Sequence, residues 1–148
     1  FVKKTVPRTT HLDSRFIDLD EILENKNSWI IKPTDHYGAE DVFAGKDFRQ
    51  DAWVQCVKDC ANGNKGYPFI AQRYITAYKT ATLKPDRGIE TLSDAEISWD
   101  ASYYNNLNGL YLYDGKFQGV FSRLGPYPTI SKPREGITQA TIWVDLEQ

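Results

Sequence analysis

The chain has 148 residues, of which 41% are hydrophobic, 14% aromatic and 26% charged, and this near-average globular composition argues against intrinsic disorder. The net charge of −2 gives no electrostatic basis for binding nucleic acid or an anionic membrane surface. No apolar run approaches the roughly 20 residues that cross a bilayer, and no signal peptide is visible. We therefore expect a cytoplasmic protein with neither nucleic acid nor a membrane as its partner.

The chain begins with Phe1 and contains no methionine, so we interpret it as a piece of a longer protein. Its length predicts one domain over residues 1–148. Residues 1–10 are basic and polar, and we expect a frayed terminus there. From Asp18 to Leu23 the sequence predicts a short helix, because Asp18 is a good N-cap, acidic residues fill the first turn and apolar residues share one face.

Trp29-Ile30-Ile31 is a short apolar run that predicts a buried strand. Pro33 cannot donate a hydrogen bond to a sheet, so this strand is expected to end near Lys32. A polar turn, Thr34 to Gly38, and a second apolar run, Asp41 to Gly45, follow. In this order, the lysine and the backbone N–H groups of the turn could converge on a phosphate. The alternative is a solvated lysine next to an ordinary hairpin.

Apolar residues from Phe48 to Cys60 recur every three or four positions, which predicts an amphipathic helix. Its two cysteines, Cys56 and Cys60, are the only ones in the chain. A metal site or a redox pair is one interpretation, but no histidine or further cysteine is close in sequence, which favours two buried or half-buried thiols. Residues 67–75 predict the next strand.

The second half of the chain reads mainly as strands. We expect strands at Ala77–Thr82, at Glu96–Tyr104 and at Thr138–Leu146, with a turn at Lys84–Gly88 and a loop at Ile130–Gly136. Residues 107–113 and 116–123 flank Asp114-Gly115, the pair typical of a type I′ hairpin turn. The carboxylates Glu96 and Asp100 either bind magnesium or, as is more usual, lie on the wet face of a strand.

Several of these motifs together resemble a known family. They are IIKPTDHYGAEDVFAG from Ile30, Asp51-Ala52-Trp53 on the helix, the strand Phe69 to Tyr74, and the hairpin Asp114 to Arg123. In order and spacing they are similar to the C-terminal part of the circularly permuted ATP-grasp proteins, which include glutathionylspermidine synthetase-like and carboxylate–amine ligase-like proteins. The resemblance runs from about Val6 to Val144. It implies an α+β fold in which a mostly antiparallel or mixed sheet carries helices on one side.

The resemblance also implies roles for individual residues. Lys32 would contact phosphate, and the loop at Tyr37 and Gly38 would act as a lid. The hinge near adenine would contain Gln72, Arg73 and Tyr74. Arg123 would meet phosphate or a substrate carboxylate as a planar fork, although a surface arginine at a strand end is equally ordinary. We name no catalytic residue and no metal ligand, because the resemblance puts the magnesium-binding acids and asparagine before Phe1.

By the same resemblance, the chain would be the ATP-binding portion of an ATP-dependent carboxylate–amine ligase. Such an enzyme phosphorylates a carboxylate to an acyl-phosphate, which an amine then attacks. Its partners would be ATP with magnesium, small carboxylate and amine substrates, and the upstream part of the same polypeptide. This portion alone is not expected to catalyse the reaction.

One departure from the pattern concerns the loop. Relatives tend to read Tyr-Gly-Gly-x-Gly-Val, whereas this chain has Ala39, Glu40 and Asp41 after Gly38. Glycine permits positive φ and a close approach to phosphate, and the two acids are expected to repel a triphosphate unless a metal bridges them. The alternative function is therefore a non-catalytic module that keeps the fold and binds a partner protein or ligand through its sheet or its aromatic surface.

Overall fold

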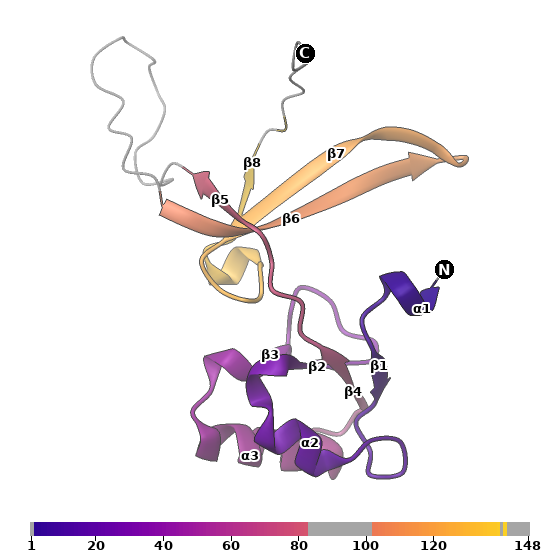
Figure 1. Cartoon of the computed structure of the whole chain (residues 1–148), viewed down its shortest axis with the longest axis vertical. Coiled ribbons are helices and arrows are strands. Elements are labelled where there is room, and N and C mark those ends of the chain that lie inside the picture. The colour runs from indigo at the N-terminus through magenta and orange to yellow at the C-terminus, as the bar shows by residue number, and fades with distance from the viewer. Residues whose placement is uncertain (1, 83–101, 140, 142–148) are drawn as a thin grey trace. The chain divides into compact units, whose positions relative to one another are not determined.

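The computed structural model describes residues 2–82, 102–139 and 141. The chain divides into two compact units, Phe1–Thr76 (unit 1) and Ala77–Gln148 (unit 2), which are described separately below (Figure 1). Helices and antiparallel sheets together confirm the predicted α+β class. Within the described part of the chain, no helix is both long enough and apolar enough to cross a membrane.

Unit 1 is built on a four-stranded sheet of order β1-β4-β2-β3. Its strands are β1 (Thr9–His11), β2 (Trp29–Pro33), β3 (Phe43–Ala44) and β4 (Phe69–Arg73), and each neighbouring pair is antiparallel. The predicted strands at Trp29 and at Phe69 are confirmed. Because side chains alternate along a strand, this sheet has one apolar face and one face with polar residues.

Two helices pack on the apolar face, α2 (Leu19–Glu24) and α3 (Gln50–Ala61), and both lie on the same side of the sheet in Figure 1. Asp18 caps α2 as predicted, since its Oδ1 accepts from the Asp20 N–H at 3.0 Å. The Trp53 indole donates to the Ile22 carbonyl at 3.0 Å and so joins the two helices. Sheet and helix residues share one core, and the members that are at most 1% exposed are Ile22, Trp29, Ile31, Trp53, Val57 and Ala71.

The first ten residues differ from expectation. They form α1 (Val2–Thr5) and the edge strand β1, so the prediction of a frayed terminus was wrong. The strand forms because β4 offers a free edge: the Arg73 N–H donates to the Arg8 carbonyl at 2.9 Å, and Thr9 pairs with Gln72 in register. This pairing is long-range and leaves no local sequence signal.

Unit 2 is a second antiparallel sheet, of order β5-β6-β7-β8, where one sheet for the whole chain had been expected. Its strands are β5 (Lys79–Thr82), β6 (Ser102–Tyr113), β7 (Lys116–Gly125) and β8 (Ile137–Gln139). Two sheets arise because β4 already has neighbours on both sides, β1 and β2, while β5 pairs with β6.

The hairpin predicted at Asp114-Gly115 is confirmed. Both residues have positive φ, 48° and 69°, as a type I′ turn requires. A 3₁₀ turn, Lys132–Arg134, precedes β8 within the predicted loop. The turn at 84–88, the carboxylates Glu96 and Asp100, and most of the strand predicted at 138–146 lie outside the described residues.

Candidate functional site

Polar side chains form a row across the face of the unit 1 sheet that lies opposite the helices. Lys32 Nζ on β2 donates to Gln72 Oε1 on β4 at 2.7 Å, and Gln72 Nε2 donates to Thr9 Oγ1 on β1 at 2.8 Å. The register explains the row, because Lys32 opposes Ile70 and Gln72 opposes Ile30, which puts all four on one face. The structure therefore brings together two residues, Lys32 and Gln72, that are 40 positions apart in the sequence.

Lys32 is a half-buried cation with a neutral partner. Burial lowers its pKa from the usual 10.5, because desolvation disfavours the charged ammonium. Among the described residues no Asp or Glu forms an ion pair with it, and Gln72 supplies only an amide oxygen. Buried charges are normally paired or coordinate a ligand, so Lys32 is the strongest candidate on this sheet for binding an anion.

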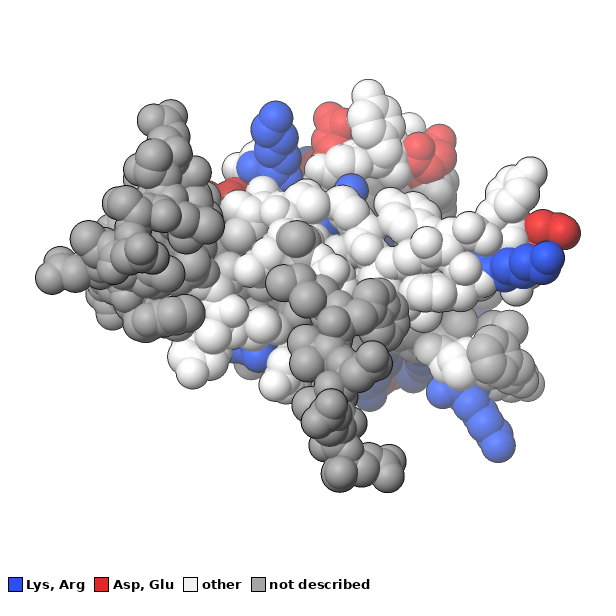
Figure 2. All heavy atoms as spheres, turned by 90° about the horizontal axis from the view of Figure 1, so that it is seen from above, with Lys and Arg blue, Asp and Glu red and all other residues white. Residues whose placement is uncertain are grey.

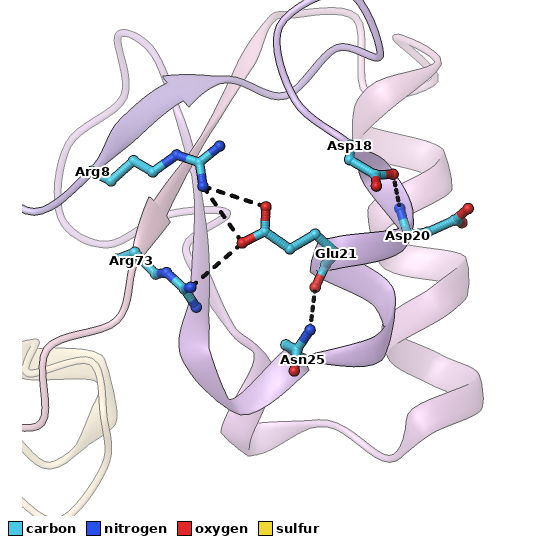
Figure 3. A network of polar contacts seen from close by, with 6 residues as sticks. All are labelled: Arg8, Asp18, Asp20, Glu21, Asn25 and Arg73. Carbon is cyan, nitrogen blue, oxygen red and sulfur yellow. Dashed lines mark hydrogen bonds and ion pairs between the residues drawn. The ribbon is translucent and has the colours of Figure 1, made fainter.

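Arg73 lies on the face of the sheet that the helices cover, because it follows Gln72 directly and successive strand residues point to opposite faces. One of its guanidinium nitrogens, NH2, is 3.4 Å from Glu21 Oε1, and its guanidinium lies 4.7 Å from the centre of the Trp29 ring. Arg8 contacts the same carboxylate at 3.3 Å, so two arginines converge on Glu21 at the end of the sheet next to α2 (Figure 3). Alternation along β4 separates Arg73 from the row formed by Lys32 and Gln72.

Tyr74 follows β4 and contacts a second lysine. Lys46 Nζ lies 4.4 Å from the centre of the Tyr74 ring and donates to Thr76 Oγ1 at 3.2 Å. Burial raises the pKa of the Tyr74 phenol. Neither Lys46 nor Thr9 was singled out from the sequence, because only the tertiary pairing places them beside Tyr74 and Gln72.

The loop after β2 has an unusual backbone. Gly38, Ala39 and Asp41 all have positive φ, at 68°, 65° and 48°. This left-handed conformation costs a non-glycine residue roughly 1–2 kcal/mol, so the loop keeps a shape that suits glycine at positions where alanine and aspartate stand. Tyr37, in the same loop, is 88% exposed.

The Asp41 carboxylate is held within unit 1. It accepts a hydrogen bond from the Tyr67 hydroxyl, and Lys65 Nζ lies 3.4 Å away. The bond from Tyr67, followed by the charge of Lys65, lowers the pKa of Asp41, and the same bond raises the pKa of Tyr67 to about 12. The repulsion expected between Asp41 and a triphosphate is therefore reduced, because its charge already has a hydrogen-bond donor and a cation.

Arg123 belongs to unit 2. It lies on β7 opposite Leu107 and Thr138, is exposed, and its guanidinium is 5.2 Å from the centre of the Phe121 ring. Its environment is that of a solvated strand residue beside an aromatic ring.

The two cysteines lie one turn apart on α3. A hydrogen bond between them lowers the pKa of Cys56 and raises that of Cys60, and both thiols are free. No set of three His, Cys, Asp or Glu side chains that could hold a metal ion occurs among residues 2–82 and 102–139. The prediction of two buried or half-buried thiols is confirmed, with Cys60 buried and Cys56 half-buried.

Comparison with models of known protein families, with curated proteins and with solved structures gave no match to this chain.

Proposed function

We propose that the chain is the ATP-binding portion of an ATP-dependent carboxylate–amine ligase of the circularly permuted ATP-grasp type. The observation that carries this proposal is the state of Lys32, a half-buried ammonium whose hydrogen-bond acceptor among the described residues is a neutral amide. A phosphate placed there would supply the missing negative charge. Lysine acts on phosphate as a point charge, and phosphoryl transfer depends largely on positioning and on neutralising phosphate charge.

The loop backbone also supports the proposal. The family pattern places glycine at the three positions where this chain has Gly38, Ala39 and Asp41, and all three have positive φ here. Ala39 and Asp41 would thus be replacements in a loop that kept its glycine-type conformation. Because Tyr67 and Lys65 hold the Asp41 carboxylate, the exposed acids that this loop would present to a phosphate are Asp35 and Glu40.

In the proposed reaction the chain's residues would bind and orient the nucleotide. Lys32 would neutralise phosphate and Gln72 would hold the lysine. The hinge from Gln72 to Tyr74 would lie near the base, and Tyr37 and Gly38 would lie on the lid. The magnesium ligands would come from upstream of Phe1, and this portion alone would not turn over substrate. A cytoplasmic location, where ATP is available, belongs to the same proposal.

Calorimetric titration of magnesium-ATP into the 148-residue chain tests the proposal. Lys32→Ala should weaken binding about tenfold, which corresponds to about 1.4 kcal/mol. Lys58→Ala is the matched control, because Lys58 is an exposed lysine on α3, the helix that packs on the other face of the sheet. The control should bind as tightly as the wild type.

Two outcomes would contradict the proposal. One is the absence of saturable binding by the wild type, and the other is equal affinity of the Lys32 and Lys58 variants. Either result would favour the alternative, a non-catalytic module that binds a partner. The observation behind that alternative is that positions 39 and 41 hold alanine and aspartate, whereas a nucleotide-binding loop would be expected to keep glycine at both.

A further inference from the structure

The outer part of the β6–β7 hairpin, Leu107 to Phe121, has only two strands, and we refer to it as the ribbon. Strand β5 pairs with β6 only over Ser102–Asn105, and β8 pairs with β7 only over Ser122–Leu124. Within the described part of unit 2, both outer edges of the ribbon therefore lack a neighbouring strand. In Figure 1 the hairpin extends well past the ends of β5 and β8.

The ribbon exposes large apolar side chains on both of its faces. Six of them are between 50% and 76% exposed, namely Leu107, Leu110, Tyr111, Leu112, Tyr113 and Phe117. Alternation puts Leu110 and Leu112 on one face and Tyr111 and Tyr113 on the other. An isolated two-stranded ribbon is marginally stable in water, so these side chains would gain from a covering surface. Uncharged atoms also predominate in the described part of the face that Figure 2 shows.

The edge of β6 carries no charged residue and no proline over Leu107–Tyr113, and the one irregularity in its pairing with β7 lies between Tyr111 and Leu112, where β7 has the extra residue. Free edges are normally blocked by charged residues or proline, yet Leu107 to Tyr113 reads LNGLYLY, without either. The β7 edge is different, because it carries a charged residue, Lys116, at the turn. The β6 edge is therefore the one suited to accept another strand.

This edge is complementary to itself. If two copies pair antiparallel about Leu110, Leu107 opposes the second copy's Tyr113, and Gly109 opposes the second copy's Tyr111. Residues directly opposite share a face, so apolar side chains meet on both faces and an aromatic ring covers a glycine. No like charges meet along the paired edge, and Asn108 already has a partner, because its Oδ1 accepts from Ser122 Oγ at 2.8 Å.

The exposed area fits a second copy. At roughly 200 Å² per aromatic side chain, the β6 rings of Tyr111 and Tyr113 leave on the order of 270 Å² exposed, given their 57% and 76% exposure. Leu107, Leu110 and Leu112 on the same strand, which are 55%, 66% and 66% exposed, add to this apolar area beside the edge. A two-fold dimer doubles this surface with no other component.

We propose that the chain forms a two-fold dimer in which the β6 edges pair antiparallel over Leu107–Tyr113. The dimer joins two four-stranded sheets into one sheet of eight strands. Because the interface is isologous, it closes at two copies.

Sedimentation velocity over a concentration series tests the dimer. The wild-type chain should move from monomer to dimer as concentration rises and stop at two copies. Leu110→Lys should weaken dimerisation at least tenfold, because two lysines would face each other across the axis. Tyr103→Lys is the matched control: Tyr103 is also an exposed apolar residue of β6, at 68%, but lies where β5 covers the edge, so this variant should dimerise like the wild type.

A mixture of variants tests the register itself. Leu110→Lys and Leu110→Glu should each be monomeric alone and should form a heterodimer when mixed, because residue 110 meets its own copy. Circular dichroism of each variant checks that unit 2 is folded. The proposal is overturned if the wild type stays monomeric at all concentrations, if it grows beyond two copies, or if the mixture does not associate.

Discussion

The unit 1 sheet and the ribbon of unit 2 use similar residues in opposite ways. In unit 1, Trp29 and Ile31 are fully buried beneath α2 and α3, and the polar row of Lys32 and Gln72 is left on the other face. In the ribbon, leucines and tyrosines remain exposed on both faces. Strand sequences alone therefore do not determine burial, since a helix or another chain must supply the covering layer.

The largest difference should appear when a large side chain is truncated in each region. Trp53 is fully buried and donates to the Ile22 carbonyl, so Trp53→Ala should lower the free energy of unfolding by about 3–5 kcal/mol. Leu110→Ala in the ribbon should change it by at most about 0.5 kcal/mol. Urea unfolding monitored by circular dichroism, at protein concentrations too low for dimerisation, measures the unfolding free energy of both variants. Equal losses would mean that the ribbon is buried in solution.

Adding a methyl group at a glycine should also affect the two regions differently. A methyl group on Gly45 would overlap the Lys26 backbone carbonyl, whereas one on Gly119 in the ribbon would meet nothing within 4 Å. Gly45→Ala should therefore cost about 1–3 kcal/mol of unfolding free energy. Gly119→Ala should be neutral, or stabilising by less than about 1 kcal/mol. If Gly45→Ala leaves the free energy of unfolding unchanged, the Lys26 backbone must move away freely, which would contradict the tight packing described for unit 1.

High pH should weaken unit 1 through Tyr67. Its bond to Asp41 raises the pKa of the phenol from 10 to about 12, so the folded state holds this proton more tightly than the unfolded state does. The bond therefore stabilises the fold below pH 10, and this contribution is lost as the pH rises through 12. We expect the melting temperature of Tyr67→Phe to fall less steeply over that interval than that of the wild type.

The control for this effect is Tyr113→Phe, which removes an exposed hydroxyl from the ribbon. It should leave the pH dependence as it is in the wild type. If both variants flatten the curve equally, the bond between Tyr67 and Asp41 is not its cause.

The smallest effect concerns the loop after β2. Ala39 has φ of 65°, so Ala39→Gly relieves strain of about 1 kcal/mol but adds unfolded-state entropy, for a net stabilisation of about 0.5 kcal/mol. The same change at Ala52, an exposed position in α3, should destabilise by about 0.5–1 kcal/mol. Opposite signs in thermal unfolding would support the loop conformation, and a loss at both positions would contradict it.

The elements predicted correctly are those with local signals. Periodicity identified α3, the β-branched run at Trp29 identified β2, and Asp114-Gly115 identified the hairpin turn. Strand β1 was missed because its three residues, Thr9 to His11, become a strand only by pairing with β4. The division into two sheets is likewise decided by pairing between distant segments, which composition and periodicity do not encode.

For the candidate site, the sequence indicated Lys32 and Gln72 but not how they are related. Alternation along β4 could have separated Gln72 from Arg73, since neighbouring strand residues point to opposite faces. Nothing local could have revealed that Glu21 takes up Arg73 or that Lys46 lies over Tyr74. Those contacts depend on how the helices and loops pack against the sheet.

The most direct test of the central claim, that Lys32 is an uncompensated cation suited to a phosphate, is its pKa with and without magnesium-ATP. Titration of the lysine side chains by NMR, with the Lys32 signal assigned from Lys32→Arg, measures both values. We predict a pKa below 10.5 in the free chain and a rise when the nucleotide binds. A pKa at or above 10.5 in the free chain, or no change with saturating nucleotide, would contradict the account.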